Sequence, residues 1–273
     1  MAELSTSGYL SEIGVPTPTA RTCPFDPGYD LYTLKGHLEQ SGHLMAALKL
    51  SMACWMLADE CVSREKVGAA HAHGVPTTTG GGPFEVAVAQ RRLPQYLDLC
   101  ADMGFVRIEC GQGFTDSELD VELVVKMAKE RDLDVQFELG SKHGGAFTRT
   151  VVQGLLDTGH RWLDAGAVEL VIEARESAQG VGLFDDAGQF DPRLADLFAE
   201  ELGLDSVLFE APTKSSQFAL LDHFGREVRL CNVRLEEILR VEIYRHGLHS
   251  DSFGKARLRP PFPADTGLGI VAP

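Results

Sequence analysis

The sequence lacks several features that would assign it to a common class of protein. No apolar run reaches the roughly 18 residues that a membrane-spanning helix needs, so we expect no spanning segment. The first residues contain no basic stretch followed by an apolar core, which predicts no signal peptide and a cytoplasmic location. None of the six cysteines belongs to a Cys-x-x-Cys pair, so we expect buried, reduced thiols and no zinc knuckle.

Positive charge is also scarce. Lys and Arg number 25 against 40 Asp and Glu, which gives a formal net charge of −15. Such a surface repels nucleic acid and anionic lipid, so neither nucleic acid nor a membrane is expected as a partner. A small anionic substrate would therefore require a locally basic site or a bound cation.

The chain does contain a regular alternation of short apolar runs and longer amphipathic runs, which is typical of parallel β/α units. Eight runs are expected to be strands: 30–33, 46–50, 74–78, 105–110, 134–139, 168–174, 206–211 and 227–231. Helical patterns between them include 92–103, 117–131, 148–165, 192–202, 215–224 and 235–246. The length of 273 residues suits one α/β barrel of roughly 250 residues.

These units predict an α/β fold, a single-domain (β/α)8 barrel of the TIM type over residues 28–255. An irregular N-terminal arm (1–27) and an irregular C-terminal tail (256–273) are expected, since both are rich in residues that do not continue helices. An open doubly wound sheet is the alternative. It would usually carry a glycine-rich phosphate loop after the first strand, and none is found there.

Charged and small residues fall at the C-terminal ends of the expected strands, where barrel enzymes place their active sites. In strand order they are Lys49, Gly81, Glu109, Glu138, Lys142, Glu173, Arg175, Glu210, Lys214 and Asn232. Four glutamates around one ring could not all ionise unaided. They are therefore expected as ligands of a divalent cation, and hard oxygen donors suit Mg²⁺. A ring of structural ion pairs that closes the barrel mouth is the alternative.

Four stretches also carry a resemblance to a known family: 80–85 (GGGPFE), 138–142 (ELGSK), 172–177 (IEARES) and 209–217 (FEAPTKSSQ). From about Gly28 to Lys255 the chain resembles phosphosulfolactate synthase, the barrel enzyme of coenzyme M biosynthesis. The resemblance implies addition of sulfite to phosphoenolpyruvate with Mg²⁺, and a homo-oligomer.

The resemblance also implies roles for single residues. Lys142 matches the second of two adjacent lysines that follow the fifth strand in the family. It is expected as the proton donor, with a pKa lowered by neighbouring cations. A phosphate clamp, or an ion pair with Glu138, is the alternative role for this lysine. Lys49 and Arg175 are expected to assist catalysis. The residues expected to bind substrate are Lys35, Gly81, Gln112, Lys214, Asn232 and His249.

The chain departs from the family pattern at several strand ends. The family's Asp-Lys-Gly after the first strand is matched here with 34–36 (LKG), so a carboxylate is expected to be missing. Gln112 replaces an Asp, and two family arginines become His246 and His249. Because these changes remove fixed charge, two further readings stay open: a different substrate in secondary metabolism, or a binding or stress-related barrel without turnover.

Overall fold

The structure, a computed structural model, describes residues 5–115 and 118–260. Eight parallel strands close into a barrel in chain order, and β1 pairs with β8 to complete the ring. This confirms the expected (β/α)8 barrel and excludes the open sheet. The strands are β1 (Thr22–Asp26), β2 (Leu48–Leu50), β3 (Thr77–Thr79), β4 (Arg107–Gly111), β5 (Asp134–Leu139), β6 (Glu169–Ile172), β7 (Val207–Glu210) and β8 (Arg229–Arg234).

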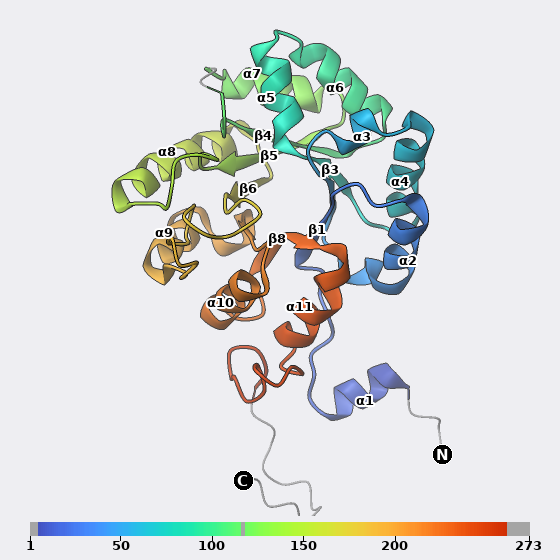
Figure 1. Cartoon of the computed structure of the whole chain (residues 1–273), viewed down its shortest axis with the longest axis vertical. Helices are drawn as coiled ribbons and strands as arrows, with labels where there is room; N and C mark the ends of the chain where they lie inside the picture. Colours follow the sequence, from blue (N-terminus) through green and yellow to red (C-terminus); the bar gives the residue numbers. More distant parts are fainter. Residues whose placement is uncertain (1–4, 116–117, 261–273) are drawn as a thin grey trace, which may run out of the picture.

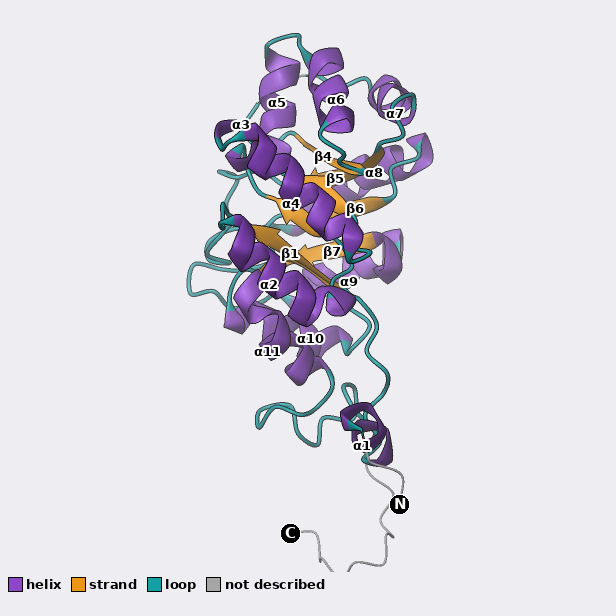
Figure 2. Cartoon of the chain, turned by 90° about the vertical axis from the view of Figure 1, so that its right-hand side faces the viewer, coloured by secondary structure: helices purple, strands orange, loops and turns teal. Residues whose placement is uncertain are grey.

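Helices surround the barrel (Figure 1), and the side view shows the strands as an inner layer between them (Figure 2). The helices are α1 (Thr6–Glu12), α2 (Leu31–Ser41), α3 (Cys54–Leu57), α4 (Glu60–Ala72), α5 (Gly81–Ala89), α6 (Leu93–Asp102), α7 (Val121–Lys129), α8 (Arg149–Ala165), α9 (Pro192–Leu202), α10 (Lys214–Phe224) and α11 (Ile238–Arg245), with short 3-10 turns η1 (Gly42–Leu44), η2 (Leu204–Ser206) and η3 (Leu235–Glu237). None of the described helices is long and apolar enough to cross a membrane.

Helix α8 illustrates how the sequence builds this outer layer. Its buried residues recur every three or four positions, from Val152 to Trp162, so that one stripe faces the barrel. The Trp162 ring stacks on Phe137 of β5, with 4.2 Å between ring centroids. The Thr148 side chain caps the first turn, and Gly166 ends the helix in the left-handed conformation that favours glycine. The helix thereby supports the strand that carries Glu138.

The first strand is the main correction to the expected fold. The stretch 30–33 is not a strand but the beginning of α2, because the Asp30 carboxylate caps that helix. It accepts hydrogen bonds from the backbone N–H of Tyr32 and of Thr33, at 2.9 and 3.1 Å. The true first strand, β1, precedes residue 28, so the barrel begins inside the expected irregular arm.

The two ends of the chain differ from simple irregular segments. Helix α1 lies away from the ring of helices in both views and buries none of its residues (Figures 1 and 2). Residues 256–258 form a turn in which Leu258 is buried. The rest of the expected C-terminal tail, 261–273, lies outside the described residues.

An ion-paired layer closes the N-terminal end of the barrel. Arg107, Glu169 and Arg229 begin the alternate strands β4, β6 and β8, and both guanidinium groups donate hydrogen bonds to the Glu169 carboxylate. Side chains contributed in layers by alternate strands are typical of this fold. The C-terminal end of the barrel is therefore the end that remains available for a site.

Candidate active site

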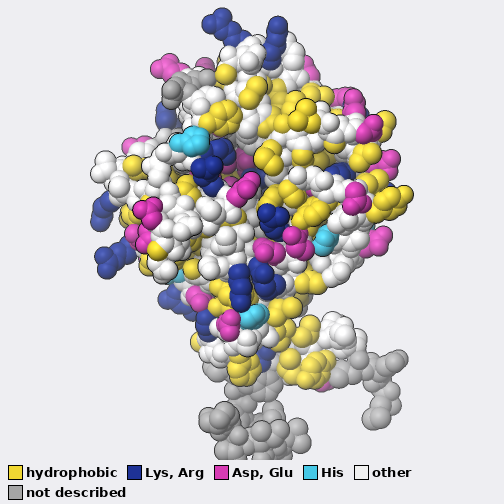
Figure 3. Space-filling view, in the orientation of Figure 1, with side chains coloured by type: hydrophobic (Ala, Val, Ile, Leu, Met, Phe, Trp, Pro, Cys, Tyr) yellow, Lys and Arg dark blue, Asp and Glu magenta, His cyan; other side chains and the backbone are white. Residues whose placement is uncertain are grey.

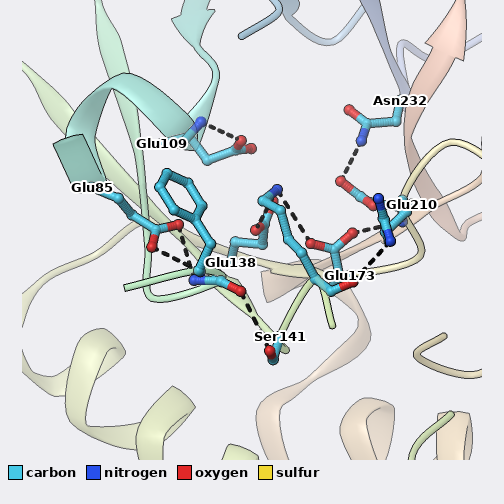
Figure 4. A network of polar contacts seen from close by, with 12 residues as sticks. Glu85, Glu109, Glu138, Ser141, Glu173, Glu210 and Asn232 are labelled. Atoms are coloured by element: carbon cyan, nitrogen blue, oxygen red, sulfur yellow. Dashed lines mark hydrogen bonds and ion pairs between the residues drawn. The ribbon is translucent and has the colours of Figure 1, made fainter. Parts of the chain in front are cut away.

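A cavity of about 1280 Å³ opens at the C-terminal ends of the strands. Nine of the residues expected at the site line it: Lys49, Gly81, Glu109, Glu138, Lys142, Glu173, Arg175, Glu210 and Asn232. In Figure 4 the carboxylates of Glu138, Glu173 and Glu210 lie close together, between Glu109 on one side and Asn232 on the other. The parallel strands thus bring charged residues that are far apart in the sequence together at one rim of the barrel.

Lys49 and Glu109 form a buried ion pair. The Lys49 Nζ lies 2.9 Å from Oε1 and 2.8 Å from Oε2 of Glu109, and 3.9 Å from Oε1 of Glu210. Glu109 also accepts hydrogen bonds from the backbone N–H of Gly81, at 2.9 Å, and from Nε2 of Gln136, at 2.7 Å. Burial alone would lower the pKa of Lys49, but the charges of Glu109 and Glu210 outweigh it and raise that pKa. Lys49 is therefore a permanent cation of the cavity floor.

Lys142 lies between two carboxylates. Its Nζ is 3.2 Å from Oε1 of Glu138 and 3.4 Å from Oε2 of Glu173. Burial opposes the charged form, but these two carboxylates outweigh it and raise the pKa of Lys142. The expected lowering of this pKa by neighbouring cations is wrong, because its nearest charged neighbours are acids. The side chain remains 32 % exposed, so its ammonium still faces the cavity.

Glu138, Glu173 and Glu210 form a coupled carboxylate cluster. Burial and the nearby charge of Glu173 raise the pKa of Glu138 to about 8, and the same two causes raise the pKa of Glu210. Glu173 behaves in the opposite way. Burial works against its ionisation, but Lys142, hydrogen bonds from the other two acids and the Arg175 backbone N–H at 2.6 Å lower its pKa. The cluster therefore carries its negative charge mainly on Glu173.

Asn232 completes this side of the rim. It has a φ of 53°, in the left-handed region that asparagine tolerates better than most residues. Its Nδ2 donates a hydrogen bond to Glu210, which also accepts one from the backbone N–H of Ala174 at 2.7 Å. The Asn232 Oδ1 is buried and has no hydrogen-bond partner among the described residues. It is therefore an acceptor available to a donor group of a ligand.

The carboxylate cluster has the donor chemistry that suits Mg²⁺. Glu138, Glu173 and Glu210 are hard oxygen donors whose mutual repulsion a cation would relieve, so these three residues would hold it. Within residues 5–115 and 118–260, however, no three His, Cys, Asp or Glu side chains already surround one metal position. Glu109 fits the role least, because Lys49, Gly81 and Gln136 already occupy its oxygens.

Four residues expected to bind substrate do not line this cavity: Lys35, Gln112, Lys214 and His249. Lys35 was expected at the end of the first strand, but it lies on α2, with its Nζ 3.6 Å from Glu65. Gln112 is exposed on the loop after β4.

The other two lie together outside the cavity. The Lys214 Nζ is 3.9 Å from Oδ2 of Asp251 and 5.1 Å from the centre of the Phe218 ring. The His249 ring packs edge-on against the same phenylalanine, with 5.2 Å between centroids. These contacts hold α10 against the segment after α11 and keep both side chains away from the strand-end cluster.

The carboxylate expected to be missing after the first strand is present. Strand β1 ends in Asp26-Pro27-Gly28, so the family's Asp-Lys-Gly is matched here with Pro27 in place of the lysine. Asp26 is fully buried, pairs with the Lys66 Nζ at 2.8 Å, and accepts hydrogen bonds from the backbone N–H of Gly28 and Tyr29. At this strand end the chain has therefore lost a cation, not an acid.

Glu85 has a role that the sequence did not reveal. It is buried on α5 and accepts hydrogen bonds from the backbone N–H of Gly113, Phe114 and Thr115, at 2.9 to 3.0 Å (Figure 4). It thereby holds the loop after β4 against the cavity. A lone acid within the apolar run of 83–89 was the available signal, since a buried charge requires several donors.

Comparison with known proteins gives the family of the chain. The family model described as (2R)-phospho-3-sulfolactate synthase matches residues 15–251. The phosphosulfolactate synthase of Methanocaldococcus jannaschii is 31 % identical over 235 residues, 86 % of this chain and 94 % of that protein. Those of Methanothermobacter thermautotrophicus and Bacillus subtilis are 27 % and 26 % identical, and the alignments cover 90 % and 87 % of this chain and 95 % and 94 % of those proteins.

Among solved structures, the Leishmania donovani UMP synthase superposes with a TM-score of 0.53 at 13 % identity, covering 88 % of this chain and 56 % of that one. At such low identity the likeness concerns the barrel fold alone. The relatives above bear the name of an enzyme, and the matched segment contains all eight strands together with the carboxylate cluster. The chain belongs to the phosphosulfolactate synthase family.

Proposed function

We propose that the chain is a carbon–sulfur bond-forming lyase that adds sulfite, or a similar small nucleophile, to phosphoenolpyruvate or a related enolpyruvyl acceptor. The observation that supports this most is the position of Lys142, whose ammonium faces the cavity between Glu138 and Glu173. Lys142 would be a proton donor in the same cavity as the cations Lys49 and Arg175, where an anionic acceptor would bind.

The reaction needs one bond to form and one proton to move. The sulfur lone pair of sulfite attacks the methylene carbon, and the electrons of the carbon–carbon double bond move toward the carboxylate as an enediolate. The adjacent carbon then takes a proton. Lys142 is fully protonated at neutral pH, because the two carboxylates raise its pKa, so a proton is available at the start of each turnover. After each turnover, water that enters the cavity would restore this proton, because the Lys142 side chain is 32 % exposed.

The charge of the enediolate would be stabilised by cations already in the cavity. Lys49 is held permanently charged by Glu109, and Arg175 reaches the same cavity while its Nη1 donates a hydrogen bond to the Lys142 carbonyl at 3.1 Å. Mg²⁺ held by the carboxylate cluster would supply further positive charge near the acceptor's carboxylate. The net charge of −15 makes this local concentration of cations the place where a small anionic substrate would bind.

The test is a phosphorus NMR assay of purified protein with phosphoenolpyruvate, sulfite and Mg²⁺. We expect a new phosphate-ester signal from the wild type, and a rate reduced by about 10²- to 10⁴-fold in Lys142→Met, because general acid catalysis contributes on this scale. Lys126→Met is the matched control, since Lys126 is 72 % exposed on α7 and does not line the cavity. A wild type that forms no product would contradict the proposal.

A second candidate, a related enzyme with a different acceptor, is favoured by one specific observation. A wall of the same cavity is apolar, formed by side chains such as Met56, Val86 and Leu99. Phosphoenolpyruvate has little apolar surface to place against such a wall. The same assay, repeated with enolpyruvyl acceptors that carry larger apolar groups, would separate the two candidates by their kcat/KM.

A further inference from the structure

The active-site cavity has an apolar wall that the proposed chemistry leaves unused. Met56 on α3, Val86 on α5 and Leu99 on α6 line it, and all three stay exposed in the described structure. Phe114, from the loop that Glu85 holds, lies on the same wall. Hydrophobic side chains gather over α5 and α6 on this face of the molecule (Figure 3). Exposed apolar groups gathered in this way often mark a binding surface.

The loop after β2 brings one more apolar side chain to the wall. Met52 is 55 % exposed and has a φ of 52°, a left-handed conformation that is uncommon for methionine. The loop packs closely on Gly80, where an added Cβ would lie only 2.6 Å from the Met52 backbone nitrogen. An exposed methionine that lines a cavity in a sparsely populated backbone conformation supports a role of this residue in binding.

The size of the cavity agrees with this. Its volume of about 1280 Å³ exceeds the roughly 300–1,000 Å³ usual for small-molecule sites, although a three-carbon acid and sulfite are among the smallest substrates. One end carries Lys142, Arg175 and the carboxylate cluster, and the other end is the apolar wall. A single continuous space therefore offers charge at its floor and hydrophobic contact at its side.

We propose that this wall is a subsite for an apolar extension of the substrate, so that the acceptor is a small amphipathic acid. Its acidic head would lie at Lys142 and Arg175, and its hydrocarbon part against Met56, Val86 and Leu99. This deepens the proposed function and rests on it for the position of the head group. A small molecule is favoured over a protein partner because the wall is continuous with a charged floor at the bottom of the barrel mouth, which a folded surface would not reach.

The test uses n-alkylphosphonates from methyl to hexyl, titrated calorimetrically into the full-length protein. We expect affinity to increase by about two- to four-fold for each methylene, because each one leaves water for the apolar wall. Val86→Gln should flatten the series and weaken hexylphosphonate by at least about five-fold, while methylphosphonate binds unchanged. Val151→Gln is the matched control, since Val151 on α8 is 46 % exposed against 51 % for Val86 but lies outside the cavity.

Two results would overturn the subsite. The first is an affinity that does not change with chain length, or no binding of any member of the series. The second is a lower mass in solution for Val86→Gln than for the wild type, which would assign the wall to contact with a second copy of the chain. Neither result depends on turnover, so failure of the sulfite reaction and failure of the subsite can be told apart.

Discussion

Glu138 is the residue whose ionisation depends most visibly on its surroundings. Its carboxyl is buried beside the charged Glu173, so its pKa rises to about 8 even though Lys142 lies 3.2 Å away. The residue types at this rim can be predicted from the sequence, because the strand ends and the glutamates on them can both be recognised there. Their pairing does not, because whether Lys142 contacts an acid or a cation depends on how neighbouring strands are staggered around the ring.

The raised pKa of Glu138 predicts how stability changes with pH in a chelator-treated protein. The folded state favours the protonated form of Glu138. The stabilisation that this preference gives to the folded protein is complete below about pH 4.5 and is lost as pH rises through about 8. Between pH 5 and 9 the wild type should lose free energy of unfolding on the order of a few kcal/mol. Glu138→Gln should lose clearly less, as measured by urea unfolding at each pH.

Glu130→Gln is the control for this measurement, because Glu130 is exposed at the end of α7. Its profile should follow the wild type. Parallel pH profiles for Glu138→Gln and the wild type would show that burial does not protonate Glu138 in the folded protein.

At the scale of elements, loops position the site as much as strands do. Gly182, in the connection between β6 and α9, has a φ of 59°, and an added Cβ would lie 2.0 Å from the Glu173 carbonyl oxygen. This close approach presses the connection against the strand end that carries the cluster's charged acid. Glycine is required there both for its backbone conformation and for space.

Gly182→Ala should therefore destabilise the protein by about 3 kcal/mol or more, since strain and a backbone clash add. It should also reduce turnover by displacing Glu173. Gly188→Ala is the matched control, because Gly188 shares the left-handed conformation, at φ 74°, but its added Cβ would lie 3.4 Å from the nearest atom. Thermal unfolding of both variants measures the difference. Equal losses would mean that strain, and not the approach to Glu173, sets the cost.

Regular elements were the part of the fold that the sequence predicted best. Strand β5 and helix α9 begin and end at the residues expected. The first alternates the apolar residues Val135, Phe137 and Leu139 with polar residues, and the second lies between a capping Asp and a Gly. Strand β1 was missed because it contains Pro24 and follows an arm of similar composition. The nearby Asp30 was read as a strand residue although it has the side chain of a helix cap.

At the scale of the whole molecule, the barrel depends on β1 but not on α1. Strand β1 pairs with both β2 and β8, so it closes the ring, whereas α1 buries none of its residues. We expect deletion of residues 1–13 to shift Tm by no more than a few degrees. Deletion of residues 1–27 should abolish the cooperative thermal transition, because it leaves two strand edges unpaired. Circular dichroism on heating measures both, and a folded, cooperative 28–273 fragment would show that β1 is dispensable.

The ion-paired layer of Arg107, Glu169 and Arg229 affects how ligands would enter and leave the cavity. Because its ion pairs fill the far end of the barrel, the reactants and product of the proposed reaction would pass through the entrance at the C-terminal ends of the strands. A large acceptor settled in that entrance would obstruct the smaller partner behind it. In the proposed reaction, the small nucleophile would therefore have to reach the cavity floor before the acceptor binds above it.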